Sequence, residues 1–522
     1  MDSKPLDLPE TLWELVEARA AATPDAVFME NDAGRSLTFA GYRDGSARVA
    51  AGLLGAGIGR GATVAWQLPT TIDAAVLMAA LSRLGATQVP IIPILRAREV
   101  TYIGRESKCD WMLVPGEWRG FDYRALADGI AAEVGFEVLT VDPPPEADPA
   151  TLPPPLTGEE AREPRWLYYT SGSTADPKGV RHRDATVMAG SNGLVRGLQP
   201  TADDLFPFVV PFTHIAGMTM GTTCLRTGMR LLVLDTFDPQ RTLPLTAERG
   251  ATIIGPALPL FQAFIGAQRA HGPERLWPRM RVGISGGAPK PLGLHQELKE
   301  VVGGAGIMGS WGLTEFPHAT CGLLDDGDDD LDRTEGVAAP GVEIRVVGLD
   351  GEEKGPNEEG ELRLRGPQMF LGYANTALDA DAFDEKGFFR TGDLGCVSET
   401  GYVTITGRVK DIIIRNAENI SAAEVEECLH LHPAIADVAV IGLPDPRTGE
   451  RACAVVSLAE GHDALTLADI AAHSREQGLA AQKTPEQLEI VDQVPRSAMG
   501  KIDKPALRAR YADQAAASPS RR

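Results

Sequence analysis

The chain has 522 residues, of which 43% are hydrophobic and 23% are charged, as is ordinary for a soluble globular protein. This length exceeds what one hydrophobic core usually serves, so we expect two or more domains. The net charge of −22 argues against nucleic acids and anionic membrane surfaces as partners, because both attract basic proteins. It does not exclude ATP, which a local basic cluster can bind.

The start of the chain, residues 1–7, has no basic segment followed by an apolar core, so it predicts no signal peptide. The longest apolar run of the first hundred residues, 74–81, is far shorter than the ~18 residues that cross a bilayer, and it predicts a buried helix. The six cysteines show neither C-x-x-C spacing nor a zinc pattern with histidine. We therefore expect reduced, packed thiols in a cytoplasmic protein.

Apolar runs alternate with helical stretches through the first part of the chain. Residues 10–22 have apolar positions at helical spacing, with Thr11 as a cap and Glu14 three residues later. Strands and helices are then expected in turn at 63–68, 73–84, 87–92, 97–106 and 111–114. This alternation predicts βαβ units and a largely parallel sheet. The proline-rich acidic segment 142–164 predicts a surface loop.

The segment after residue 165 has the composition of a phosphate-binding loop. An aromatic run, 166–169, predicts a strand, and a loop rich in hydroxyl groups follows it: Thr170, Ser171, Gly172, Ser173 and Thr174. Lys178 ends the loop after a proline turn. Hydroxyl and backbone N–H groups donate to phosphate oxygens, glycine permits close approach, and the lysine adds positive charge. The pattern is not the Walker motif, and a polar turn with an incidental lysine is the alternative.

The alternation continues beyond this loop. Asp184 is expected to cap a helix that runs to about residue 197. Further strands are expected at 205–211, 229–234, 252–254, 281–285 and 361–365. The acidic run 325–332 is most simply a solvated loop. From residue 402 short predicted strands alternate with helices in a compact α+β pattern. Ser421 and Glu424 form a capping box there.

A second nucleotide motif occupies residues 308–315. Trp311 can stack on a purine, Thr314 can hydrogen-bond an oxyanion, and Glu315 is a hard oxygen ligand suited to Mg²⁺. An exposed helix cap is the alternative.

Residues 171–180 resemble the nucleotide loop of the adenylate-forming superfamily, which contains acyl-CoA synthetases, peptide-synthetase adenylation domains and luciferases. The other motifs occur in the family's order, and the chain looks most like bacterial medium-chain or alicyclic acyl-CoA synthetases. The resemblance implies an α/β fold with a large N-terminal region of stacked α/β subdomains, residues 1–407. A small mobile α+β C-terminal domain, 408–511, would follow, before a disordered tail, 512–522. The active site would lie at the junction of the two domains.

The resemblance also implies a role for each motif. The adenine would lie along the backbone of Gly286, Gly287, Ala288 and Pro289, and Trp311 would keep the stacking role of the family's usual tyrosine. The remaining roles are ribose binding by Asp393 and Arg408, a hinge at Lys410, contact of Lys501 with the substrate carboxylate and α-phosphate, and His214 in the acyl pocket. The alternatives are ordinary turns for the glycine and aspartate motifs, surface lysines, and a histidine satisfied in the core.

The implied reaction is attack of a carboxylate on the α-phosphorus of ATP, with Mg²⁺, followed by transfer from acyl-AMP to coenzyme A. The neighbours of His214 are apolar and include no aspartate for an ammonium group, so a hydrophobic carboxylic acid is expected. Asn416 and Ala417 stand where the family's coenzyme A ligases usually carry Gly-Gly beside the pantetheine.

Three hypotheses remain open: a complete acyl-CoA ligase, an enzyme that hands acyl-AMP to a separate acceptor protein, and a non-catalytic nucleotide-binding protein. Sequence determines neither the acid nor the oligomeric state, although homodimers are common among such enzymes.

Overall fold

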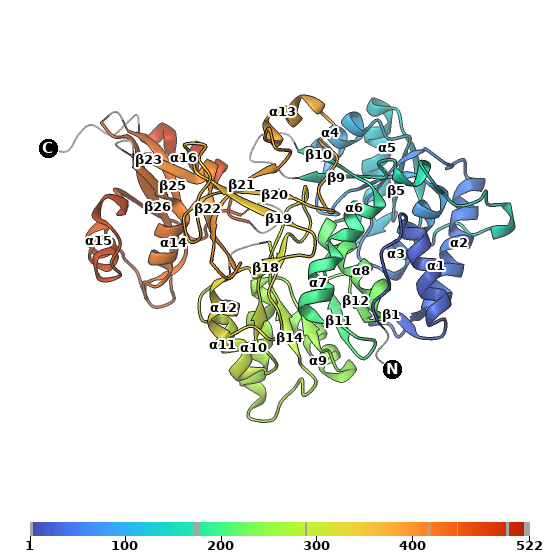
Figure 1. The fold of residues 1–522 in the computed structure, drawn as a ribbon, viewed down its shortest axis with the longest axis horizontal. Coiled ribbons are helices and arrows are strands. Elements are labelled where there is room, and N and C mark those ends of the chain that lie inside the picture. The colour runs from blue at the N-terminus through green and yellow to red at the C-terminus, as the bar shows by residue number, and fades with distance from the viewer. Residues whose placement is uncertain are drawn as a thin grey trace. The chain divides into compact units, whose positions relative to one another are not determined.

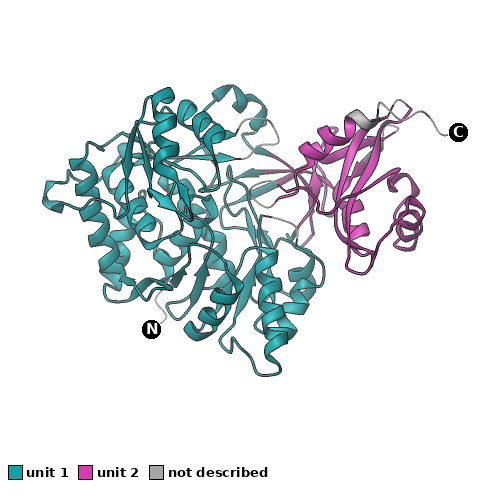
Figure 2. Ribbon diagram, turned by 180° about the vertical axis from the view of Figure 1, so that it is seen from behind, with its two compact units in different colours: residues 1–344, 364–390, 400–403 teal, residues 345–363, 391–399, 404–522 magenta. Residues whose placement is uncertain are grey.

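A computed structural model describes residues 4–170, 177–287, 290–415, 418–445, 447–496 and 501–515, except for the side chains of 418, 419 and 513–515. The chain divides into two compact units (Figures 1 and 2). The first unit comprises Met1–Ile344, Leu364–Arg390 and Thr400–Val403, and the second comprises Arg345–Arg363, Thr391–Glu399 and Thr404–Arg522. The structure therefore divides the chain at more points than the single predicted boundary between residues 407 and 408.

A six-stranded sheet of the first unit carries the predicted phosphate loop. Its strands lie in the order β10 (Lys178–His182), β9 (Trp166–Thr170), β4 (Thr87–Pro90), β3 (Thr63–Trp66), β5 (Trp111–Val114) and β8 (Glu137–Thr140). Neighbouring strands from β9 to β8 pair in parallel, whereas β10 runs antiparallel to β9. Helices α3 (Ile72–Leu84) and α4 (Ala97–Ser107) connect the parallel strands. The predicted βαβ order and largely parallel sheet are thus confirmed.

Smaller sheets complete the first unit. A four-stranded sheet has the order β11 (Leu205–Phe208), β12 (Arg230–Val233), β1 (Val27–Asn31) and β2 (Ser36–Thr38). A parallel three-stranded sheet consists of β13 (Ile253–Ile254), β14 (Val282–Ile284) and β15 (Ile307–Met308). An antiparallel one consists of β16 (Ser310–Trp311), β17 (Thr320–Cys321) and β18 (Val337–Ala338), and β6 (Glu117–Trp118) pairs with β7 (Phe121–Asp122).

The other helices of the first unit surround these sheets. They are α1 (Leu12–Ala22), α2 (Phe39–Gly55), α5 (Tyr123–Val134), α6 (Asp184–Ala189), α7 (Ser191–Leu198), α8 (Ile215–Thr227), α9 (Pro239–Arg249), α10 (Leu258–His271), α11 (Leu294–Val301), α12 (Asp328–Arg333) and α13 (Asp379–Ala382). At α1 the predicted capping box is present, since Thr11 accepts from the Glu14 N–H and the Glu14 carboxylate accepts from the Thr11 N–H. Within the described residues, no helix combines the length and apolar character that crossing a bilayer requires.

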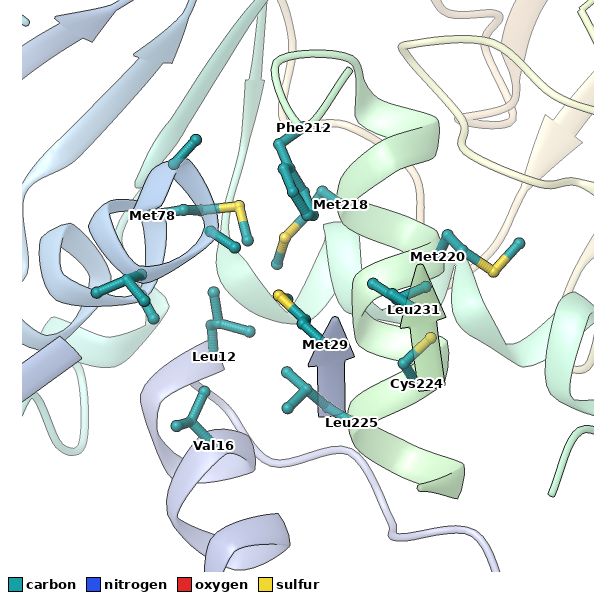
Figure 3. Close-up of a cluster of buried hydrophobic side chains, with 14 of the residues drawn as sticks. Leu12, Val16, Met29, Met78, Phe212, Met218, Met220, Cys224, Leu225 and Leu231 are labelled. Carbon is teal, nitrogen blue, oxygen red and sulfur yellow. The ribbon is translucent and has the colours of Figure 1, made fainter. Parts of the chain in front are cut away.

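The main core of the first unit is apolar and rich in methionine. Figure 3 shows Met29 of β1 and Met78 of α3 pointing toward Met218 of α8, with Leu12 of α1 nearby. Met218 is fully buried there, so it is a residue of the core.

Asp184 corrects one expectation about this core. The N-cap of α6 is Arg183, and Asp184 is the first residue of the helix, with 3% of its surface exposed. Its carboxylate accepts from the backbone N–H of Leu12 (2.8 Å), the hydroxyl of Ser82 (3.1 Å) and the indole N–H of Trp166 (2.6 Å). The residue therefore joins α1, α3 and β9 instead of capping α6, which ends at Ala189 and gives way to α7.

The second unit contains most of one sheet and all of another. The first has the order β19 (Glu343–Val347), β20 (Gly360–Arg365), β21 (Phe389–Val397) and β22 (Val403–Arg408), and this pairing is why segments before residue 404 belong to the unit. The second sheet has the order β24 (Glu418–Ser421), β23 (Ile412–Arg415), β26 (Gly449–Leu458) and β25 (Ile435–Asp445), and β27 (Gln487–Ile490) also pairs with β26.

Helices α14 (Ala422–His430) and α15 (Leu467–Glu476) belong to the second unit, where the Ser421 hydroxyl caps α14 by accepting from the Glu424 N–H. Helix α16 (Lys504–Ala515) extends beyond the predicted start of the tail at residue 512. Its Leu507 and Tyr511 are buried in an apolar cluster with β25 and β26, which stabilises the helix. Residues 516–522 lie outside the described residues.

Candidate active site

The hairpin of β9 and β10 holds both ends of the predicted phosphate loop. Thr170, the last residue of β9, pairs directly with Lys178, the first residue of β10. Four predicted nucleotide-binding residues, Ser171, Gly172, Ser173 and Thr174, lie outside the described residues. The hairpin therefore sets where the loop leaves and re-enters the sheet.

A segment far away in the sequence, residues 370–374, runs along the other side of β10. Leu371 donates its N–H to the Arg181 carbonyl (2.9 Å), and Ala374 donates to the Gly179 carbonyl (2.7 Å). A Cβ added at Gly179 would lie 2.9 Å from Glu106 Oε2 and 3.0 Å from the Ala374 Cβ. Glycine at this position therefore permits the close packing of the segment against the hairpin.

Glu315 is anchored by this same segment. Its backbone carbonyl accepts from the Phe370 N–H (3.0 Å), and its carboxylate Oε1 accepts from the Tyr373 hydroxyl (2.8 Å). The ammonium of Lys178 lies 5.3 Å from the centre of the Tyr373 ring, within the range of a cation–π interaction. Burial, and then the neighbouring Glu315 carboxylate, raise the pKa of Tyr373, so the phenol stays protonated and acts as a donor.

A second link joins β10 to Thr314. His182, a fully buried residue of β10, has Nε2 2.8 Å from the Thr314 carbonyl and Nδ1 2.9 Å from the Thr186 hydroxyl. Burial lowers the pKa of His182 to about 4, so the ring is neutral. Because a carbonyl only accepts, the proton of the neutral ring resides on Nε2, which donates to Thr314. The sequence predicts no role for His182 or Tyr373, because neither residue belongs to a motif.

Trp311 lies in β16 and is 7% exposed. Next to it, the Ser310 hydroxyl lies 2.8 Å from Nδ1 of His318. Burial, and then repulsion from His214, lower the pKa of His318 to about 4, so the two histidines share one region of the first unit. His214 itself caps α8, since its Nδ1 accepts from the Ala216 N–H (3.1 Å). Its predicted contact with the acyl group and the stacking role of Trp311 stay predictions.

The predicted adenine turn follows β14. Gly287 has a φ of +81°, which favours glycine, and a Cβ at Gly286 would lie 3.1 Å from the Ser310 carbonyl. The turn thus lies against the strand that carries Trp311. Ala288 and Pro289 lie outside the described residues.

The second unit contains the other predicted site residues. Arg408 Nε lies 2.8 Å from Asp393 Oδ1, and Asp393 is 4% exposed, so the predicted ribose-binding pair is in contact. Burial, and then the charge of Arg408, lower the pKa of Lys410. Lys501 is exposed and follows residues 497–500, which lie outside the described residues, as do Asn416 and Ala417. The hinge and catalytic roles of the two lysines stay predictions.

The described residues include no cluster of three or more His, Cys, Asp or Glu side chains that could hold a metal ion. The predicted metal site therefore has one carboxylate ligand from the described residues, that of Glu315. This donor set fits Mg²⁺, which proteins commonly bind through one or two carboxylates together with the phosphates of a nucleotide.

Comparison with known proteins defines the class of this protein. The family model described as AMP-binding enzyme matches residues 16–374, and the model described as AMP-binding enzyme C-terminal domain matches residues 424–501. The chain belongs to the AMP-binding enzyme family, and the predicted membership of the adenylate-forming superfamily is confirmed.

Relatives with assigned names narrow the class. The chain is 32% identical to a medium-chain fatty-acid–CoA ligase of Escherichia coli (strain K12), with 95% of this chain and 90% of the relative aligned. It is 31% identical to a salicyl-AMP ligase / salicyl-S-ArCP synthetase of Mycobacterium tuberculosis (95% and 90%). It is 30% identical to 3-[(3aS,4S,7aS)-7a-methyl-1,5-dioxo-octahydro-1H-inden-4-yl]propanoyl:CoA ligase of Rhodococcus jostii (90% and 93%).

The fold matches solved structures as well. ATP-bound MatB from Rhodopseudomonas palustris superposes with a TM-score of 0.85 at 27% identity, covering 96% of this chain and 99% of that one. The predicted fold class, a large α/β N-terminal region with a small C-terminal domain, is confirmed. The protein is thus an enzyme of the ligase class.

Proposed function

We propose that this enzyme converts a hydrophobic carboxylic acid and ATP into acyl-AMP and pyrophosphate, and then transfers the acyl group to coenzyme A. One observation carries the proposal: Lys178, Thr314 and Glu315 are held to the same hairpin. Tyr373 contacts both Lys178 and Glu315, and His182 of β10 binds the Thr314 carbonyl. The residues to which we assign phosphate binding, oxyanion donation and metal binding are therefore linked to one hairpin.

The first half-reaction forms one P–O bond and breaks another. A carboxylate oxygen of the acid attacks the α-phosphorus of ATP, and the bridging oxygen leaves with pyrophosphate. Such a transfer requires mainly positioning and stabilisation of charge. The phosphate loop and Lys178 hold the phosphates, the Thr314 hydroxyl donates to an oxyanion, and Lys501 stabilises the charge that develops at phosphorus.

Glu315 would hold Mg²⁺ together with the nucleotide phosphates. When bound, the ion neutralises phosphate charge and acts as a Lewis acid. The protein's part is to present the Glu315 carboxylate in a fixed orientation, which the hydrogen bond from Tyr373 provides.

In the second half-reaction the thiol sulfur of coenzyme A attacks the acyl carbon, AMP leaves, and the thiol proton passes to solvent. The second unit would turn about Lys410, which withdraws Lys501 and presents residues 415–420 to the pantetheine arm. Asn416 and Ala417 motivate the alternative function, in which acyl-AMP passes to a separate acceptor protein. The relatives include ligases of both kinds.

The acid is proposed to be a fatty or alicyclic one. Support comes from the apolar segment around His214 and from relatives named for a medium-chain fatty acid and for a fused-ring propanoic acid.

We also propose a cytoplasmic location, supported by six cysteines that are all free thiols. We propose a homodimer as well, which light scattering on the purified protein tests.

Pyrophosphate release measured over a panel of medium-chain, alicyclic and aromatic acids tests the first half-reaction. Lys501→Ala is expected to lower the rate about 100-fold, as removal of a preorganised oxyanion donor does. Lys483→Ala is the control, because that lysine also lies in the second unit but is paired with Glu424 at 2.6 Å. Release that is unchanged in Lys501→Ala would refute the role of Lys501, and release with none of the acids would favour a non-catalytic nucleotide-binding protein.

Separate quantification of acyl-AMP and acyl-CoA tests the second half-reaction. Efficient formation of the thioester refutes the acyl-AMP ligase alternative. Accumulation of acyl-AMP without thioester refutes the complete ligase.

A further inference from the structure

Tyr373 lies between two residues that the proposed function assigns to the nucleotide. It is 5% exposed, its hydroxyl donates to Glu315 Oε1 at 2.8 Å, and its ring centre is 5.3 Å from the Lys178 ammonium. Lys178 and Glu315 are 137 positions apart in the chain. One side chain thus contacts the end of the phosphate loop and the predicted metal ligand together.

The backbone and ring of Tyr373 are themselves fixed. Its N–H donates to Asp379 Oδ1 (2.8 Å), and the residue bridges to Val180 in the middle of β10. The ring packs edge-on against Phe370, with centres 5.0 Å apart and an interplanar angle of 67°. The phenol therefore cannot turn away from Glu315 without losing the ring contacts with Phe370 and Lys178.

The chemistry of the phenol sets what it does to Glu315. A protonated hydroxyl is a donor, and a carboxylate is an acceptor with two oxygens. A hydrogen bond to Oε1 fixes the plane of the carboxylate before any ligand arrives. Removal of a residue that hydrogen-bonds to a metal ligand and orients it typically lowers metal affinity or activity about 10–100-fold. The ring face meanwhile attracts the ammonium of Lys178.

We propose that Tyr373 is a positioning residue for adenylation, which holds Glu315 and Lys178 in one fixed relation so that a metal–nucleotide complex meets ordered partners. The inference rests on the proposed function, because it takes Glu315 as the ligand of a nucleotide-bound metal. The sequence motifs do not indicate this role. It follows only from the pairing of residues 370–374 with β10, which brings Tyr373 to Lys178 and Glu315.

Calorimetric binding of ATP to Tyr373→Phe, with Mg²⁺ and with EDTA in its place, tests the proposal without turnover. Phenylalanine keeps the ring beside Lys178 and removes only the hydroxyl that binds Glu315. We expect binding of Mg–ATP to weaken about 10-fold or more, and binding of ATP in EDTA to change less than about 3-fold. Equal weakening under both conditions would refute the proposal and indicate a packing role.

Tyr168→Phe is the matched control. Tyr168 lies on β9 of the same sheet, and its hydroxyl is buried without a hydrogen-bond partner in the described structure. The same atom is removed there, and Mg–ATP binding is expected to be unchanged. Thermal unfolding of both variants shows whether either one has lost its fold.

A double-mutant cycle separates this inference from the proposed function. If Tyr373 acts through Glu315, Tyr373→Phe has no further effect on Mg–ATP binding in a Glu315→Gln background. Additive effects would overturn the inference. The inference alone fails under three conditions together: the parent enzyme releases pyrophosphate, ATP binding by Glu315→Gln no longer depends on Mg²⁺, and Tyr373→Phe binds Mg–ATP as the parent does. If the parent enzyme releases none with any acid, the proposed function fails instead.

Discussion

Replacement of Asp184 by alanine is expected to destabilise the first unit strongly. The side chain is 3% exposed and accepts three hydrogen bonds, from Leu12, Ser82 and Trp166. Each buried donor left without a partner costs about 1–3 kcal/mol. One effect offsets part of this loss, because the burial that raises the pKa of Asp184 no longer opposes folding. We therefore expect a net loss of about 3 kcal/mol in the free energy of unfolding.

Urea unfolding followed by tryptophan fluorescence measures this loss. All seven tryptophans fall within Met1–Ile344, so the signal reports the first unit and avoids mixing two transitions. Asp184→Asn, which keeps the size and one acceptor oxygen, is expected to lose about 1–2 kcal/mol.

Asp122→Ala is the control for this measurement. It removes a carboxylate that caps α5 through one exposed bond to the Ala125 N–H at 2.8 Å, and it should cost about 1 kcal/mol. A loss for Asp184→Ala no greater than that of this control would contradict the reasoning.

Two further changes test other parts of the structure. Burial raises the pKa of Glu335, beside Lys290, to about 7, so its contribution to stability is full below the ordinary glutamate pKa and is lost as pH rises through about 7. Between pH 5 and pH 8, the free energy of unfolding of Glu335→Gln is expected to rise by up to about 3 kcal/mol relative to that of the parent. A difference between the two proteins in urea unfolding that does not depend on pH would contradict this. Gly179→Ala places a Cβ 2.9 Å from Glu106 Oε2 and is expected to cost about 1–3 kcal/mol and to slow pyrophosphate release, whereas parental stability and rate would show that the hairpin tolerates the methyl group.

Sequence alone predicted the regular parts of the fold well. The strand 111–114 and the helix 73–84 were expected within one residue of β5 and α3. A short apolar run indicates the strand, and the longer Ala- and Leu-rich stretch indicates the helix. The two predicted nucleotide motifs of the first unit, around Lys178 and Glu315, are linked through one segment of the structure.

What the sequence could not predict depends on contacts between distant residues. Asp184 looks like a helix cap because aspartate before a helical run is the usual cap pattern. Only the packing of α1, α3 and β9 shows the three donors that it meets. His182 and Tyr373 lie 132 and 58 positions from their partners Thr314 and Glu315. No local periodicity connects such pairs, so their roles follow from tertiary structure alone.

The discontinuous second unit has a consequence for protein engineering. A chimera that exchanges everything after residue 403 would transplant most of β22 and all of β23 to β27. It would leave behind Arg345–Arg363 and Thr391–Glu399, which hold most of the rest of the sheet that β22 joins through β21. The donor's strands would then meet a foreign neighbour, whose side chains were not selected to fit them. Grafts that move all three segments together should express as folded hybrids more often than single-junction fusions.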